Sequence, residues 1–153
     1  MGLEQDMDDW WADFKREEEE HQQFELSLAK IREEMAKVKV FPQTSFELTG
    51  GSSLKGSVRA DYAELVRAFG NPMEGDGSKT QVEWVVLFEV SEHDTVLATI
   101  YDWKKYDQRP VEVTHWNIGG HDYRAADMVI DYLNYLRDMD AVLPVFNERV
   151  SNA

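Results

Sequence analysis

Cysteine is absent from the 153 residues of this chain. Without thiols the protein can form no disulfide framework, no thiolate zinc site and no cysteine nucleophile. The sequence also lacks any apolar run close to the ~18 residues that a membrane-spanning helix requires. Its first ten residues are acidic and contain no apolar segment, so we expect no secretory signal and a cytosolic location.

Basic residues are scarce: 16 Lys and Arg face 30 Asp and Glu, for a net charge of −14. The excess is concentrated in residues 1–25, which hold ten acids and two bases. A field of this sign repels phosphate backbones and anionic lipid, so we expect neither direct nucleic-acid binding nor membrane binding. The charge is compatible with a protein partner that has a basic surface, or with mimicry of nucleic acid towards a nucleic-acid-binding protein. An acidic surface that serves solubility alone is the alternative.

Residues 3–38 carry a heptad pattern, with apolar side chains spaced alternately by four and three residues, and contain no Pro or Gly. The pattern positions are Leu3, Met7, Trp10, Phe14, Glu17, His21, Phe24, Leu28, Ile31, Met35 and Val38. The pattern predicts one helix, about 54 Å long at ~1.5 Å per residue, which exceeds what a small domain covers. We therefore expect the helix to form a homodimer through residues 3–38, to pack on the rest of the chain, or to bind another protein.

The first half of this predicted helix combines aromatic side chains with acids. Tryptophan is enriched at the energetic centres of protein interfaces, which suggests a partner-binding segment, although the same side chains would also suit a core. The residues predicted to bind a partner are Trp10, Trp11, Phe14, Asp6, Asp9, Asp13, Glu17 and Glu18. Within the heptad pattern, Glu17 and His21 predict either a pH-sensitive polar layer or an exposed stretch.

The rest of the chain predicts an α+β fold: a long N-terminal helix (1–40), a linker (41–53) and a compact domain (54–153) of order β-α-β-β-β-α with an antiparallel sheet. The expected strands are 54–60, 82–90, 95–103 and 111–118, with a short edge strand around Phe46 and Leu48. The expected helices are 62–69, capped by Asp61 and ended by Gly70 and Pro72, and 123–139, followed by an apolar tail at 142–146 that docks on the domain. Trp84, Trp103 and Trp116 are expected in the core.

Residues 54–138 contain an ordered set of motifs. These are Tyr62…Leu65…Phe69-Gly70…Pro72, Val82-Glu83-Trp84, Ala98-Thr99-Ile100-Tyr101-Asp102-Trp103 and Trp116-Asn117-Ile118-Gly119-Gly120. The set resembles a group of small, mostly uncharacterised accessory proteins of bacteriophages and other DNA viruses that share a Trp-x-Ile-Gly-Gly core. Position 117 is often His in that group and is Asn117 here, so any role of that His is absent. The resemblance implies a non-enzymatic, anti-CRISPR-like accessory protein in the host cytosol that binds and inhibits a host defence protein.

One candidate ligand turn is visible in the sequence: Gly119 and Gly120, followed by His121 and Arg124. Two glycines before a helix can expose backbone N–H groups to an anion, which would make the protein a sponge for an anionic nucleotide, or they can simply form the turn. We predict no catalytic residue, no metal and no cofactor. A metal-dependent hydrolase using Asp102, His115 and Glu83 and a purely structural oligomer are the further alternatives.

Overall fold

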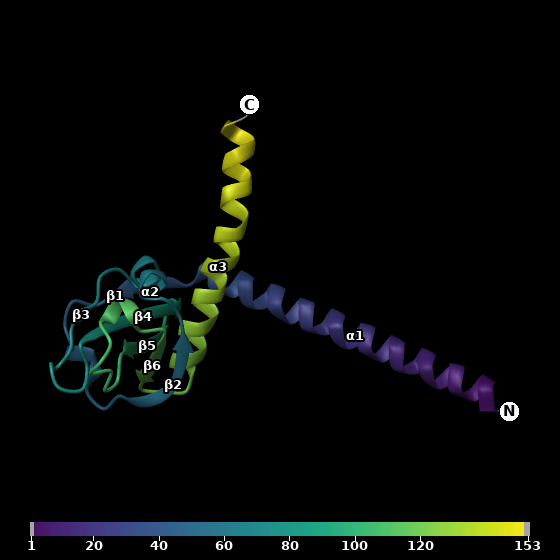
Figure 1. Ribbon diagram of the computed structural model, residues 1–153, viewed down its shortest axis with the longest axis horizontal. Helices are drawn as coiled ribbons and strands as arrows, with labels where there is room; N and C mark the ends of the chain where they lie inside the picture. Colours follow the sequence, from purple (N-terminus) through teal and green to yellow (C-terminus); the bar gives the residue numbers. More distant parts are fainter. Residues whose placement is uncertain (1, 152–153) are drawn as a thin grey trace. The chain divides into compact units, whose positions relative to one another are not determined.

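The computed structural model describes residues 2–151, with side chains described from residue 6 to residue 140. Two compact units divide the chain, residues 1–34 and 35–153. The described residues of the first unit lie within α1, a single helix over Gly2–Lys37 that confirms the long helix predicted from the heptad pattern (Figure 1). The second unit contains an antiparallel sheet and two longer helices, so the α+β class is confirmed.

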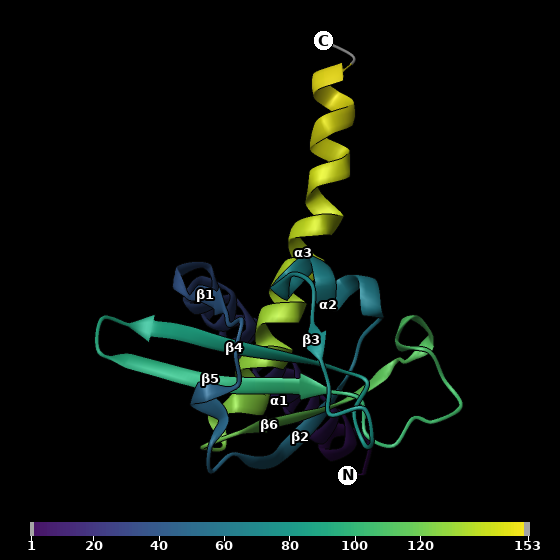
Figure 2. The same ribbon diagram turned by 90° about the vertical axis from the view of Figure 1, so that its left-hand side faces the viewer.

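The sheet has six strands, and all its pairings are antiparallel. The strands are β1 (Lys39–Pro42), β2 (Ser53–Arg59), β3 (Met73–Glu74), β4 (Val82–Ser91), β5 (Asp94–Tyr101) and β6 (His115–Gly120). The spatial order is β1-β4-β5-β6-β2, with β3 beside β4 (Figures 1 and 2). The predicted meander of three consecutive strands is therefore present as β4, β5 and β6. The third strand begins at His115 and not at residue 111, because Pro110–Glu112 form a 3₁₀ helix, η2.

One face of the sheet forms the core under two helices, α2 (Tyr62–Phe69) and α3 (Arg124–Ser151). The alternation along β4 points Trp84, Val86 and Phe88 to this face, and all three side chains are buried. Phe88 meets Phe69 of α2 edge to face at 6.0 Å between ring centroids, and it also meets Tyr132 of α3. The helix α3 passes behind the β4–β5 hairpin in Figure 2.

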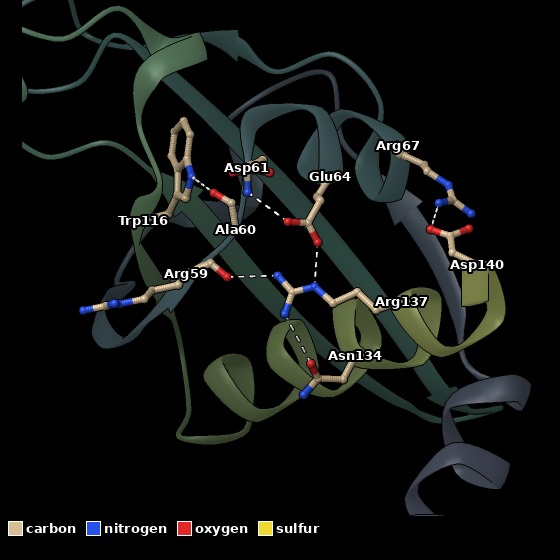
Figure 3. Close-up of polar contacts among 9 residues, drawn as sticks. All are labelled: Arg59, Ala60, Asp61, Glu64, Arg67, Trp116, Asn134, Arg137 and Asp140. Carbon is tan, nitrogen blue, oxygen red and sulfur yellow. Dashed lines mark hydrogen bonds and ion pairs between the residues drawn. The ribbon is translucent and has the colours of Figure 1, made fainter.

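The helix α2 occupies the residues predicted for it. Its N-terminus is held by Glu64, whose Oε1 accepts the backbone N–H of Asp61 at 3.1 Å (Figure 3). Its C-terminus ends at Gly70, which adopts a φ of 81° that favours glycine. Two indole N–H groups attach the sheet to the ends of the helix: Trp84 donates to the Gly70 carbonyl and Trp116 donates to the Ala60 carbonyl.

Residues 41–53 differ from the predicted linker. Phe41 and Pro42 belong to β1, the edge strand that pairs with β4, and Gln43 continues the contact by donating to the Val85 carbonyl. An edge strand tolerates Pro42 because its missing N–H can face away from the sheet. The edge strand predicted around Phe46 and Leu48 was wrong: Glu47–Thr49 form a short 3₁₀ helix, η1, on the other face of the sheet from α2 and α3.

Three further expectations are corrected. Trp103 is 42% exposed and lies outside the core, whereas Trp84 and Trp116 are buried against each other. Gly119 and Gly120 continue β6 and do not break it. The last helix begins after Asp122, whose carboxylate accepts the Arg124 N–H, but it continues past residue 139 to 151. The predicted docking of residues 142–146 concerns side chains outside the described residues.

Candidate functional site

The predicted partner-binding aromatics form an exposed cluster on α1. Trp10, Trp11 and Phe14 are 63%, 53% and 44% exposed. Each ring lies 5.6 Å from the other two, measured between centroids, so the three side chains cover one another and still offer a common surface. We call these three residues the aromatic cluster. Met7, one turn earlier at helical spacing, is also exposed and extends the same apolar stripe.

Acidic side chains surround the aromatic cluster. All five acids predicted to bind a partner are exposed: Asp6, Asp9, Asp13, Glu17 and Glu18. Arg16 is paired with Asp13 on the same helix, so one of the two bases in residues 1–25 is already neutralised. His21, one of the two polar heptad positions, is exposed beside Glu25. The segment can therefore present a ring stack inside a negative field, which suits a basic and partly apolar surface.

The predicted ligand turn is not assembled as an anion site. Gly119 and Gly120 pair with β2 on one side and with β5 on the other, so their backbone groups belong to the sheet. The ring nitrogen Nε2 of His121 lies 2.8 Å from the Leu48 carbonyl and holds η1. Arg124 donates to both carboxylate oxygens of Asp94 and to Asp122, and these hydrogen bonds raise the pKa of its guanidinium.

Gly120 is required by packing. A Cβ atom at this position would lie 2.4 Å from the Cβ of Ala125 and 2.8 Å from the Leu97 carbonyl oxygen. The start of α3 approaches β6 so closely that only glycine fits. The second glycine of the Gly-Gly sequence is therefore explained by the contact of helix and sheet.

The hydrolase alternative also lacks support from its residues. Asp102 is buried and accepts the backbone N–H groups of Gln81 at 2.9 Å and Val82 at 3.1 Å, and also the Gln81 side-chain amide at 3.0 Å. These bonds use the carboxylate to join the start of β4 to the end of β5. His115 is exposed and pairs with Arg59 on β2. Among residues 6–140, no three His, Asp or Glu side chains are grouped closely enough to hold a metal ion.

The sequence did not predict a groove of about 530 Å³ on the sheet face opposite α2 and α3. We call it the Thr99 groove, after the residue in its floor. Residues around η1 line one side of it, the loop between β3 and β4 lines another, and the ends of β4 and β5 complete it. The lining residues are Phe46, Thr49, Ser52, Ser53, Gly75, Asp76, Thr80, Glu83, Thr99, Tyr101, Trp103 and Gly119.

Register explains the floor of the groove. Glu83 on β4 stands opposite Tyr101 on β5, and Thr99 stands opposite Gly119 on β6. Burial raises the pKa of the Glu83 carboxyl, and the nearby carboxylates of Asp76 and Asp102 raise it further. Burial and the charge of Glu83 raise the pKa of the Tyr101 hydroxyl.

The loop between β3 and β4 forms a rigid wall of the groove. The Asp76 carboxylate accepts the backbone N–H groups of Ser78, Lys79 and Thr80 at 2.7 to 3.0 Å, and these bonds lower its pKa. The Thr80 hydroxyl in turn accepts the Asp76 N–H. This loop geometry fixes a negative charge at the edge of the groove.

Trp103 closes the groove at the end of β5. The ammonium groups of Lys79 and Lys104 each lie 5.6 Å from the centroid of its ring. Lys104 adopts a φ of 55°, which is uncommon for a residue other than glycine, and its N–H donates to the Lys79 carbonyl. The backbone therefore holds both lysines beside the indole.

The only sequence signal related to this groove is the presence of polar residues at alternate positions of the strands. Glu83, Thr99, Tyr101 and Asn117 occupy strand positions that point away from the helices. Alternation of this kind is equally typical of a solvated sheet face. The segments that wall the groove come from loops distant in sequence, so only the folded chain shows the site.

A comparison of the chain with protein-family models, with curated proteins and with solved structures finds no match in any of the three. No described helix is long and apolar enough to cross a lipid bilayer.

Proposed function

We propose that this chain is a non-enzymatic phage accessory protein that binds and inhibits a host protein with a basic surface. The target class that fits best is a nucleic-acid-directed defence protein such as a nuclease. The observation that carries the proposal is the aromatic cluster of Trp10, Trp11 and Phe14, stacked and exposed on the acidic part of α1. The resemblance of residues 54–138 to viral accessory proteins supports the phage assignment.

Exposed aromatic rings on a helix keep apolar surface in contact with water, and a partner that covers them gains the burial of that surface. Aromatic side chains lose little conformational entropy on binding, which makes them effective anchors. The acids around the rings attract a basic surface from a distance and accelerate the encounter. Rings would therefore supply affinity, and carboxylates would supply selectivity for a positively charged target.

The distribution of charge favours a different protein over a second copy at the start of α1. Residues 2–20 contain nine acids and two bases, whereas residues 21–37 contain three of each. A parallel, in-register pair of α1 helices would bring the two acidic halves together, and like charges at that distance repel. A basic partner removes this penalty.

The test compares the full chain with two variants in affinity capture from a bacterial lysate at low and high salt. The triple variant W10A/W11A/F14A removes the aromatic cluster, and Phe24→Ala removes one exposed ring of the same helix beyond residues 2–20, which hold nine of the acids. We expect the wild type and the Phe24→Ala variant to retain the same basic protein. We expect the triple variant to lose it, and high salt to weaken the retention.

The captured protein is then assayed with and without the purified chain, because inhibition is part of the proposal. An unaffected target activity would contradict inhibition, and undiminished capture by the triple variant would contradict the role of the aromatic cluster. Circular dichroism of the triple variant checks that α1 remains helical.

A structural homodimer through residues 3–38 is a second candidate, because the heptad stripe continues beyond the aromatic cluster to Phe24, which is 60% exposed. Light scattering of the full chain over a range of micromolar concentrations distinguishes the two functions. A dimer that Phe24→Ala dissociates would favour the homodimer. A monomer throughout the range would remove it.

A further inference from the structure

We propose that the Thr99 groove binds an organic cation carrying a primary ammonium or guanidinium group. The site is formed within residues 35–153 and shares no residue with the aromatic cluster, so the inference is independent of the function proposed for α1. The cation has two natural sources: a free aliphatic amine, or a Lys or Arg side chain on the surface of a bound protein.

The charge of the lining selects a cation. Asp76 and Glu83 contribute two carboxyl groups, and no Lys, Arg or His is among the lining residues. Most of the remaining polar side chains are hydroxyls, which can accept hydrogen bonds as well as donate them, and the Trp103 indole N–H only donates. An ammonium or guanidinium group only donates, so it can use those acceptors that have no protein partner, whereas an anion would face two like charges.

The floor of the groove holds a polar group without a protein partner. Thr99 is only 4% exposed, and within the described residues its hydroxyl makes no hydrogen bond and is not sealed from the groove. A Cβ atom at Gly119 would lie 2.6 Å from this hydroxyl oxygen, so glycine at that position keeps the space above it open. A hydroxyl that is open to a cavity and lacks a protein partner can be satisfied by a ligand or by water.

Glu83 and Tyr101 offer further groups directed to the same space. Neither the Glu83 carboxylate nor the Tyr101 hydroxyl has a hydrogen-bond partner in the described part of the chain. The surroundings of Glu83 are unfavourable for its charge because they contain the carboxylates of Asp76 and Asp102. A bound cation would relieve that repulsion and supply the missing donors.

Aromatic walls suit the same ligand. Phe46, Tyr101 and Trp103 line the groove, and ring faces attract ammonium and guanidinium groups. The ring of Trp103 already has the ammonium groups of Lys79 and Lys104 at 5.6 Å from its centroid, so we assign the ligand cation to the rings of Phe46 and Tyr101. The volume of about 530 Å³ lies in the range of small-ligand sites and accommodates the aliphatic chain of an amine.

The experiment is an NMR titration of the ¹⁵N-labelled full chain with four probes. Agmatine and spermidine represent free amines, a capped Gly-Arg-Gly peptide represents a protein side chain, and AMP represents an anion. Chemical-shift changes at the amides of Thr99, Tyr101 and Gly119 locate binding in the groove. This mapping separates the groove from diffuse attraction to the acidic helix.

Three variants complete the design. Glu83→Gln removes one charge from the groove, and Thr99→Val removes the unpartnered hydroxyl at nearly constant volume. Glu89→Gln is the matched control, because it removes the same charge from the same face of the same strand outside the groove lining. Circular dichroism confirms that each variant is folded, and the two groove variants test the site independently.

We expect at least one cationic probe to shift the groove amides in a saturable way, and AMP to leave them unchanged. Glu83→Gln should weaken the affinity about tenfold or more, since a charge-assisted hydrogen bond is lost, while Glu89→Gln should change it less than twofold. Tighter binding of the free amines than of the peptide would identify a small metabolite as the source of the cation. Tighter binding of the peptide would identify a protein side chain as that source. The proposal is overturned if no cation shifts these amides at millimolar concentration, if Glu89→Gln weakens binding as much as Glu83→Gln, or if AMP occupies the groove.

Discussion

The Arg137 guanidinium of α3 donates to the Glu64 carboxylate of α2 at 2.6 Å (Figure 3). The same guanidinium donates to the backbone carbonyl of Arg59 at 3.0 Å, and the other oxygen of Glu64 accepts the Asp61 N–H. One ion pair therefore connects the end of β2, the start of α2 and the middle of α3. Both side chains are partly exposed, at 34% for Glu64 and 44% for Arg137, so solvent screens the charge and its contribution to stability is modest.

Substitution of Glu64 should separate its two roles. Glu64→Ala removes both the ion pair and the acceptor for the Asp61 N–H, and we expect a loss of about 1–2 kcal/mol in the free energy of unfolding. Glu64→Gln keeps an acceptor at the start of α2 and should lose about half of that. Urea unfolding measures both values. Equal losses in the two variants would show that the hydrogen bond from the Asp61 N–H to Glu64 contributes nothing to stability.

The stability contributed by Glu64 should depend on pH. The hydrogen bond from Arg137, helped by the Asp61 N–H and opposed by burial, lowers the pKa of Glu64 below its ordinary value of 4.5. As pH falls, the Glu64 carboxylate of the unfolded chain takes up its proton before that of the folded chain does. The contribution of Glu64 to stability is therefore complete above the pKa of the unfolded chain, and it is lost as pH falls through the lower pKa of the folded chain. The difference in unfolding free energy between wild type and Glu64→Gln should therefore shrink below about pH 4.5. A difference that is constant from pH 7 to pH 3 would contradict this.

Removing the charge of Asp102 should destabilise the sheet. Its carboxylate accepts two backbone N–H groups and the amide of Gln81, and that amide also donates to the carbonyls of Lys105 and Gln108. In Asp102→Asn the new side-chain N–H₂ group would face the N–H₂ group of Gln81, and two donors cannot bond each other. The Gln81 amide cannot rotate to present its oxygen without losing its hydrogen bonds to the Lys105 and Gln108 carbonyls. We expect a loss of about 2–3 kcal/mol in thermal or urea unfolding.

The exposed Asp107, five residues further along the chain, offers a control for Asp102. Asp107→Asn removes the same charge outside the buried network and should change the unfolding free energy by less than about 0.5 kcal/mol. A comparable loss in both variants would mean that net charge is responsible and that the network is not.

A comparison of two glycines tests the packing of α3 on β6. A methyl group at Gly120 would meet Ala125 and the Leu97 carbonyl, whereas nothing lies within 4 Å of the same atom at Gly50. Gly120→Ala should cost about 1–3 kcal/mol, because neither backbone nor helix can yield cheaply. Gly50→Ala should be neutral or slightly stabilising. Tolerance of alanine at Gly120 would contradict the close approach of helix and sheet.

Glu83 should reduce stability at neutral pH. Its pKa is raised by burial and by the carboxylates of Asp76 and Asp102, so the folded chain holds the proton to higher pH than the unfolded chain does. The free energy of unfolding therefore decreases as pH rises from the ordinary Glu83 pKa of 4.5 through its raised pKa in the folded chain. Glu83→Gln should stabilise the protein by about 0.5–1 kcal/mol at pH 7, as expected where a binding group is kept at a cost to folding.

The pH profile checks the cause of that stabilisation. The advantage of Glu83→Gln over wild type should disappear below about pH 4.5, where the carboxyl group is protonated in both states. Glu89→Gln, on the same strand face, should show a smaller effect at pH 7. A Glu83→Gln variant that melts at a lower temperature than wild type at pH 7 would contradict the origin assigned to the pKa shift.

The sequence by itself determined those elements whose signals are local. The heptad spacing from Met7 to Met35 requires only the period of a helix, and α1 follows it. Asp61, Glu64 and Gly70 define both ends of α2 by hydrogen bonds within a few residues. The alternation in β4 and β5 identified a hairpin, because each residue's face is determined by its place along the strand.

Only the tertiary structure decided which residues meet across long separations. It placed β1 at the edge of the sheet and brought Gly120 of β6 against α3. It also engaged His121 and Arg124 in hydrogen bonds that hold the fold. The Thr99 groove arises in the same way, from η1, the β3–β4 loop and the four strands β2, β4, β5 and β6. The physical reason is that sheet register and loop closure depend on the packing of the whole domain, which no local pattern records.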